Sequence, residues 1–159
     1  MVNAVPMSQS RTIQTKLILP PDTNHHPTIF GGKVLSYIDE IAAITAMKHA
    51  KSEVVTASID SVDFVSPAYA GEVLELEAIV TSTGRSSMEV YVRVICKNLI
   101  TSEERLTTES FITMVAINNQ GKTTEVPPVF PETEMEQRLF ETGPQRREHR
   151  KAKRAFRHE

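Results

Sequence analysis

The feature that most limits the fold of this chain is a change in the spacing of its apolar residues near position 51. From Gly32 to about Lys51 the spacing is helical, and at 100° per residue seven positions fall on one arc of roughly 120°. These positions are Val34, Leu35, Ile38, Ala42, Thr45, Ala46 and His49. Further along the chain apolar and polar residues alternate, as they do in half-buried strands. The sequence therefore predicts one long helix followed by a succession of strands.

The strands are expected at five places, which are Thr12–Leu19, Val54–Phe64, Glu72–Ser82, Ser87–Leu99 and Leu106–Ile117. Short turns join the last four, and short turns favour antiparallel neighbours. An antiparallel sheet with a single long helix must bury that helix on one concave face. Ala42, Ala43 and Ala46 are small enough to let a curved sheet wrap closely around the helix. We predict an α+β fold in which an antiparallel sheet of five to six strands wraps around one long helix.

The length of 159 residues fits one domain, which we place at residues 1–131. Residues 132–159 are expected to form a polar helix from Glu132 to about Glu141 and, after Gly143-Pro144, a basic tail. From Arg146 onward seven Lys and Arg face two Glu, a net charge of +5, whereas the first 145 residues carry −7. Such a tail is most simply solvated and frayed, and the alternative is binding to a polyanion. The acidic body and the aromatic content of 6% argue against a nucleic-acid surface.

Composition narrows the class of protein further. Hydrophobic residues make up 40% of the chain and charged residues 24%, as in ordinary soluble proteins. No apolar run approaches the ~18 residues of a membrane span, and the first eleven residues lack a secretion signal, so we expect a cytoplasmic location. Cys96 alternates with buried-type valines and is predicted to be a structural thiol. His25 and His26 are adjacent and point apart on an extended chain, so no metal site is expected.

Candidate site residues gather around the start of the long helix. Gly31-Gly32 leaves backbone N–H groups with no side chain over them, so a carbonyl or phosphate can approach closely. Asn24 offers an amide that can donate to an oxygen, and Asp39 lies on the shoulder of the buried helix face. A donor, a bare helix N-terminus and an acid suit the polarisation of a carbonyl and the attack on it. The alternative for Asp39 is a boundary acid with a hydrogen-bond partner, while Glu40 is expected in solvent.

Four blocks of sequence resemble the hotdog-fold acyl-CoA thioesterases, in particular the bacterial YciA-like and brain-type acyl-CoA hydrolase branch. The first block is Asn24 followed by Phe30-Gly31-Gly32 and Leu35-Ser36-Tyr37-Ile38-Asp39-Glu40. The others are Thr56-Ala57-Ser58-Ile59-Asp60, Thr83-Gly84-Arg85-Ser86-Ser87-Met88-Glu89 and Phe111-Ile112-Thr113-Met114-Val115-Ala116. The resemblance extends from about Thr12 to Pro131. His25-His26-Pro27 is bulkier than this family leads us to expect between Asn24 and Phe30.

The resemblance implies a site shared between two protomers whose sheets join edge to edge. Asn24 of one protomer would work with Asp39 of the other, and a thioester carbonyl would lie against the Gly32 N–H. Asp39 would activate water as a general base or attack directly to give a mixed anhydride. Thr56 would steady the water or Asp39, unless it is a plain strand residue. Bacterial members are commonly trimers of dimers, and no metal or redox cofactor is implied.

The turn Gly84-Arg85-Ser86-Ser87 matches the coenzyme A contact of this family. It offers N–H groups, two hydroxyls and a guanidinium to a diphosphate, although a hairpin turn with a solvated arginine has the same sequence. Arg93, on the outer face of the following strand with Glu89, is a weaker phosphate candidate. We expect Arg85 to contribute more to substrate binding than the flexible tail after Gln145 does.

Two further functions remain open. One is a hydratase or dehydratase acting on acyl thioesters, because the His-Pro before the glycines and the helical acid also resemble the dehydratases of the same fold, although Asn24 and Asp39 fit the thioesterases better. The other is a non-catalytic acyl-CoA or nucleotide sensor whose basic tail docks a partner. Hydrolysis releases a free thiol from acyl-CoA, whereas neither of these two alternatives does, so a measurement of thiol release distinguishes them.

Overall fold

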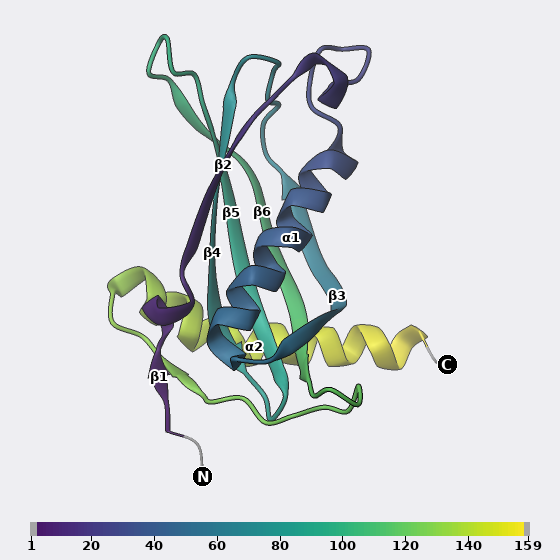
Figure 1. Cartoon of the computed structure of the whole chain (residues 1–159), viewed down its shortest axis with the longest axis vertical. Helices are drawn as coiled ribbons and strands as arrows, with labels where there is room; N and C mark the ends of the chain where they lie inside the picture. Colours follow the sequence, from purple (N-terminus) through teal and green to yellow (C-terminus); the bar gives the residue numbers. More distant parts are fainter. Residues whose placement is uncertain (1–2, 158–159) are drawn as a thin grey trace.

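One long helix is held in the concave face of a five-stranded antiparallel sheet (Figure 1). The computed structural model describes residues 3–157. The helix is α1 (Gly31–Ala50), and the sheet contains β2 (Thr12–Leu17), β3 (Glu53–Phe64), β4 (Val73–Thr83), β5 (Ser87–Lys97) and β6 (Glu104–Ile117), in the order β2-β4-β5-β6-β3. The predicted hotdog architecture is confirmed, and each predicted strand lies within two residues of its expected bounds.

Four shorter elements join and flank this unit. They are the 3-10 helices η1 (Met7–Ser10) and η2 (Pro20–Asp22) and the strands β1 (Val5–Pro6) and β7 (Val129–Phe130). β1 and β7 pair in parallel, so the start of the described chain is tied to the segment that precedes the last helix.

The core lies between α1 and the sheet. The buried side chains of α1 include Val34, Ile38, Ala42 and Ala46, as the helical spacing predicts. Ile41 is also buried, whereas Leu35 is only half-buried, so the packed face is rotated slightly from the expected arc. The facing strands contribute alternate residues that are fully buried, among them Leu74, Leu76, Val90, Val92, Ile112 and Met114.

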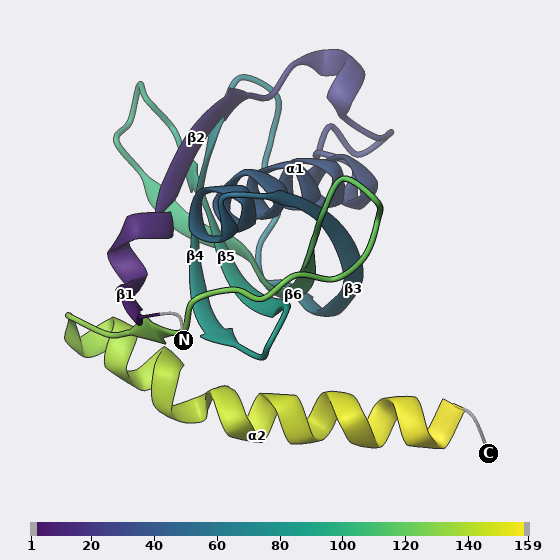
Figure 2. The same cartoon turned by 60° about the horizontal axis from the view of Figure 1, so that its bottom comes forward.

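The second long helix, α2 (Glu134–Arg157), crosses the opposite face of the sheet (Figure 2). The prediction of a short helix followed by a frayed tail is therefore wrong, because α2 continues through Gly143-Pro144 to Arg157. Its axis bends in the first half, as expected for a helix that contains an internal proline. Beyond this bend, ion pairs of Arg146 and Arg150 with Glu89 of the sheet stabilise the helical conformation.

β3 forms one edge of the sheet and leaves apolar side chains in solvent. Val55 is 45% exposed, Ile59 41% and Phe64 55%. A strand of 12 residues with unpaired backbone groups and exposed apolar side chains is a surface on which another strand can dock. No helix among residues 3–157 is long and apolar enough to cross a membrane.

Candidate active site

Asp39 and Thr56 meet where α1 faces the edge strand β3. The hydroxyl of Thr56 donates a 2.7 Å hydrogen bond to Oδ1 of Asp39. Both residues are exposed in the single chain, so the expectation that Asp39 is half removed from water does not hold there. The reason is its position beside β3, because no strand within residues 3–157 lies beyond that edge. Glu40 is exposed, as predicted, with Lys16 3.4 Å away.

The loop before α1 fixes the orientation of the Asn24 amide. Oδ1 of Asn24 accepts hydrogen bonds from the N–H of His26 at 2.8 Å and from the hydroxyl of Thr28 at 3.1 Å. Because the amide oxygen is engaged within the loop, the NH₂ group is directed away from these partners and remains a donor for another molecule. Backbone hydrogen bonds from Asn24 to Thr28 and from Phe30 to Asp22 close the loop.

α1 begins at Gly31 with exposed backbone donors. Phe30 is the N-cap residue and gives no side-chain cap, and among residues 3–157 the N–H groups of Gly31 and Gly32 have no hydrogen-bond acceptor. A Cβ atom on Gly32 would meet nothing within 4 Å, whereas one on Gly31 would lie 3.3 Å from the ring of Phe64. Gly32 therefore presents the positive end of the helix dipole to open space.

A pocket of about 350 Å³ lies beside this helix N-terminus. It is lined mainly by apolar groups of the loop, of α1 and of the end of β3, which include Ile29, Gly31, Val34, Phe64, Val65 and Ala68. An apolar group bound there would end next to the glycine N–H groups.

Gly32 and Asp39 of one chain are too far apart to act on the same carbonyl. They lie seven residues apart in a continuous helix, which places their backbones about 10 Å apart along its axis. The sequence analysis placed the acid close to the helix N-terminus, and within one chain this is not so. A carbonyl held at Gly32 therefore lies about two helical turns from the Asp39 of the same chain.

The turn Gly84-Arg85-Ser86-Ser87 joins β4 and β5 at the end of the sheet. The Gly84 N–H donates to the carbonyl of Ser87 at 2.9 Å, and the carbonyls of Arg85 and Ser86 accept hydrogen bonds from Val126 and Ala116. The guanidinium of Arg85 is exposed. These bonds fix the backbone of the turn and leave its side chains free to bind a ligand.

The turn Gly84-Arg85-Ser86-Ser87 lies in the same part of the sheet as Thr56, whereas Arg93 lies in a different part. Ser87 pairs with Val115, which pairs in turn with Val55, so the turn is two strands from the edge at about the level of Thr56. Arg93 is six residues further along β5, roughly 20 Å away, and lies 3.7 Å from Glu77. The structure therefore separates Arg93 from the other phosphate candidates.

The remaining sequence predictions concern single residues. Cys96 is fully buried, and burial raises the pKa of its thiol to about 11, which suits the predicted structural role. Among residues 3–157 no group of three or more His, Cys, Asp or Glu side chains is arranged to hold a metal ion.

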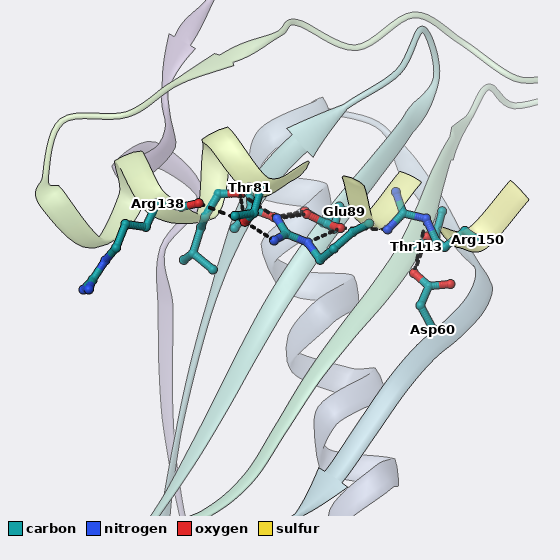
Figure 3. A network of polar contacts seen from close by, with 9 residues as sticks. Asp60, Thr81, Glu89, Thr113, Arg138 and Arg150 are labelled. Carbon is teal, nitrogen blue, oxygen red and sulfur yellow. Dashed lines mark hydrogen bonds and ion pairs between the residues drawn. The ribbon is translucent and has the colours of Figure 1, made fainter. Parts of the chain in front are cut away.

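A buried polar network on the outer face of the sheet was missed by the sequence analysis (Figure 3). Glu89, predicted on the outer face of its strand, is only 2% exposed because α2 covers it. Its carboxylate accepts hydrogen bonds from Arg146 at 2.8 and 2.9 Å, from Arg150 at 2.7 Å and from the hydroxyl of Thr81 at 2.6 Å. Burial opposes the charged form, but these hydrogen bonds outweigh it and hold the pKa of Glu89 below its usual value.

This network corrects the interpretation of the basic tail. Arg146 and Arg150 are not solvated but paired with Glu89. The guanidinium of Arg146 also stacks over the ring of Phe111, with its Cζ atom 4.3 Å from the ring centroid. The only signal in the sequence was the spacing of basic residues at i and i+4, which marks one helix face. That spacing cannot reveal which acid the face meets.

Comparison with known proteins agrees with this geometry. The family model described as Thioesterase superfamily matches residues 26–102. The chain is 49% identical over 143 residues to the uncharacterized acyl-CoA thioester hydrolase YkhA of Bacillus subtilis, a match that covers 90% of this chain and 83% of that protein. It is 36% identical over 154 residues to the cytosolic acyl coenzyme A thioester hydrolase of Rattus norvegicus, of which it spans 40%.

Two solved structures match over nearly the whole chain. A hexameric acyl-CoA thioesterase in its apo form superposes with a TM-score of 0.95 at 66% identity, covering 97% of this chain and 99% of that one. The acyl-CoA hydrolase of Staphylococcus aureus, bound to butyryl coenzyme A, coenzyme A and coenzyme A disulfide, superposes with a TM-score of 0.91 at 47% identity, with coverages of 94% and 92%. The chain belongs to the hotdog-fold thioesterase superfamily, and within it to the acyl-CoA thioester hydrolases.

Proposed function

We propose that this protein hydrolyses acyl-CoA thioesters to a free carboxylic acid and coenzyme A at a site built from two protomers. The observation that carries the proposal is the carboxylate of Asp39. One of its oxygens is held by Thr56, and the side chain faces an edge of the sheet that is open in the single chain. A carboxylate fixed through one oxygen can use the other to take a proton or to attack a carbonyl carbon.

In the proposed reaction one protomer polarises the thioester and its partner attacks it. The NH₂ of Asn24 and the N–H of Gly32 stabilise the negative charge that develops on the carbonyl oxygen. Asp39 of the other protomer removes a proton from water, whose oxygen bonds to the carbonyl carbon. The C–S bond then breaks, and the proton passes to the leaving thiolate. In the alternative route Asp39 attacks directly, and water hydrolyses the resulting mixed anhydride.

The relatives support these assignments. Variants of the S. aureus hydrolase have been solved in which an asparagine, an aspartate and a threonine are replaced by alanine, and these three residues are separated by 15 and 17 positions. Asn24, Asp39 and Thr56 follow in the same order at the same intervals. The turn from Gly84 to Ser87 is proposed to bind the phosphates of coenzyme A, and the apolar pocket beside Gly31 to receive the acyl chain.

We also propose that the active unit is at least a dimer and assembles further into a trimer of dimers. The exposed apolar edge of β3 and the distance between Gly32 and Asp39 within one chain support the dimer. A 66% identical thioesterase that is hexameric supports the larger assembly. The name of the rat relative supports a cytoplasmic location.

The reaction is tested by measuring thiol release from acyl-CoA substrates of different chain lengths. Wild-type protein should release coenzyme A, and Asp39→Asn should lose about 10²–10⁴ in kcat, the usual contribution of a general base. Glu40→Gln is the matched control on the solvent side of α1 and should keep wild-type turnover. Normal turnover by a folded Asp39→Asn protein would refute the assignment.

The shared site is tested by mixing two inactive variants. Asn24→Ala and Asp39→Ala protomers should regain activity when combined, because a mixed dimer contains one site with both residues intact. Mixed dimers verified by mass spectrometry that remain inactive would place both residues within one chain.

A further inference from the structure

α2 is fixed against the sheet at two points close to the turn between β4 and β5. Gly143 packs so tightly on β4 that a Cβ atom there would lie 3.2 Å from the side chain of Ser82. One turn later Arg146 forms its two hydrogen bonds with the buried Glu89, and Arg150 adds a third. Residues at i, i+3 and i+7 share one face of a helix, so this part of α2 cannot rotate without breaking these contacts.

The same helix face carries Arg147, which lies against the turn. Its Nη2 atom is 3.6 Å from the position that a Cβ atom on Gly84 would occupy, and the side chain is half-buried. Arg85 is the next residue of the turn, and its side chain is exposed.

Arg147 differs from three basic residues close to it on α2, each of which has an acidic partner. Arg146 and Arg150 are paired with Glu89, and Lys151 is paired with Glu148. Within residues 3–157 neither Arg147 nor Arg85 forms an ion pair with a carboxylate. Arg147 therefore places a cation against this turn without an acid to neutralise it, and a bound anion would supply the missing partner.

We propose that Arg147 is a second phosphate-binding residue and that, with Arg85 and the hydroxyls of Ser86 and Ser87, it holds a phosphate group of coenzyme A. This inference rests on the proposed function and extends it to α2, which lies outside the four sequence blocks that define the resemblance. Arginine suits the role because its planar guanidinium can give two parallel hydrogen bonds to phosphate oxygens. The buried pairs of Arg146 and Arg150 fix the helix backbone at this residue, so only its side chain has to be ordered when substrate binds.

The proposal is tested first by equilibrium binding, which does not depend on turnover. Calorimetry with coenzyme A should give a dissociation constant about 10-fold higher for Arg147→Gln than for wild type, the loss expected for one charge-assisted hydrogen bond. Arg138→Gln is the matched control, since it removes the same charge from the same helix at an exposed side chain that points away from the network (Figure 3). The control should stay within about twofold of wild type.

Substrate analogues identify the phosphate and separate binding from structure. An acyl ester of N-acetylcysteamine has no nucleotide, so Arg147→Gln should hydrolyse it at the wild-type rate while KM for acyl-CoA rises. Acyl dephospho-coenzyme A lacks the 3′-phosphate. If the variant and wild type have the same KM for it, Arg147 binds the 3′-phosphate; if the KM of the variant is still higher, Arg147 binds the diphosphate.

The outcomes distinguish this inference from the proposed function. If wild-type protein releases no thiol from acyl-CoA, the hydrolase proposal fails, and the binding measurement still decides the role of Arg147. An unchanged dissociation constant for coenzyme A in a folded Arg147→Gln protein would overturn the inference. An equal loss of hydrolytic activity on acyl-CoA and on the N-acetylcysteamine ester would also overturn the inference, because Arg147 would then have a structural role.

Discussion

The two faces of the sheet are covered by helices that are held in different ways. α1 packs into the concave face through apolar side chains such as Ile38 and Ala42, which are fully buried. α2 crosses the outer face through Gly143 and a row of arginines, and its firmest contact is with one buried acid, Glu89. Burial of apolar area stabilises α1 without directional demands, whereas α2 depends on hydrogen bonds of defined geometry.

This difference explains which helix the sequence predicted. Apolar periodicity reports only the kind of packing that α1 uses. α2 packs few apolar side chains, Leu139 among them, against the rest of the protein, and Gly143-Pro144 lies inside it, so local signals indicated a break and a solvated tail. The following substitutions test whether the two faces differ in the way the contacts indicate.

The largest effect on stability is expected from Arg146→Ala. It leaves the buried carboxylate of Glu89 with Arg150 as its only cationic partner and removes the stacking on Phe111. Breaking a buried ion pair from one side costs about 3–5 kcal/mol. The free energy of unfolding, measured by urea denaturation, should fall by that amount, while Arg138→Ala should change it little.

Acid should erase the difference between Arg146→Ala and wild type. Because the pKa of Glu89 is lowered in the folded state, its contribution is present above its ordinary pKa near 4.5 and is lost as pH falls below that value. A difference that persists unchanged at the lowest pH would mean that Arg146 stabilises the protein by packing alone.

On the concave face Ile38→Ala should cost about 2–5 kcal/mol, since it leaves a cavity between α1 and the sheet. Ile38 is fully buried among apolar side chains. The loss, measured in the same denaturation series, should be independent of salt and should persist below pH 4.5, unlike that of Arg146→Ala. A clear salt dependence would contradict the contrast between the two faces.

The sequence predicted the concave half of the molecule and part of the candidate site. Strands and α1 follow from spacing, and the pairing of Thr56 with Asp39 follows from the resemblance. The exposure of Asp39 could not be predicted, because it depends on β3 being the edge strand of this chain. The burial of Glu89 could not be predicted either, since its strand alternation correctly placed it on the outer face and only α2 removes it from water.

A smaller effect should come from His49, which is 2% exposed near the end of α1. Its Nε2 lies 2.7 Å from the carbonyl of Pro127, and burial lowers the pKa of the imidazole despite that contact. The unfolded chain therefore takes up a proton first as pH falls below about 6.5, and stability falls by up to about 1.4 kcal/mol per pH unit. Denaturation between pH 7 and 5 should show this slope.

The window between pH 6.5 and 5 isolates His49 from Glu89, which titrates at lower pH. His49→Gln should flatten the slope in this window, and His149→Gln, which removes an exposed imidazole, should leave it as in wild type. An unchanged slope in His49→Gln would assign the pH dependence to another group.

The smallest effects on stability, and the finest test of the contrast, come from one glycine in each helix. A Cβ atom on Gly32 meets nothing within 4 Å, so Gly32→Ala should leave stability unchanged or raise it by up to about 1 kcal/mol through helix propensity. A Cβ atom on Gly143 would lie 3.2 Å from the side chain of Ser82. The clash should outweigh the gain from helix propensity, so Gly143→Ala should destabilise the protein by about 1 kcal/mol. Activity should follow the opposite order, because a methyl group on Gly32 would stand where the proposed mechanism brings the thioester carbonyl to the Gly32 N–H. Thermal unfolding ranks the two variants by stability, and thiol release ranks them by activity. A Gly32→Ala protein that is stable and fully active would show that the substrate does not approach that end of α1. A Gly143→Ala protein more stable than wild type would show that the side chain of Ser82 moves aside and that the arginines alone hold α2.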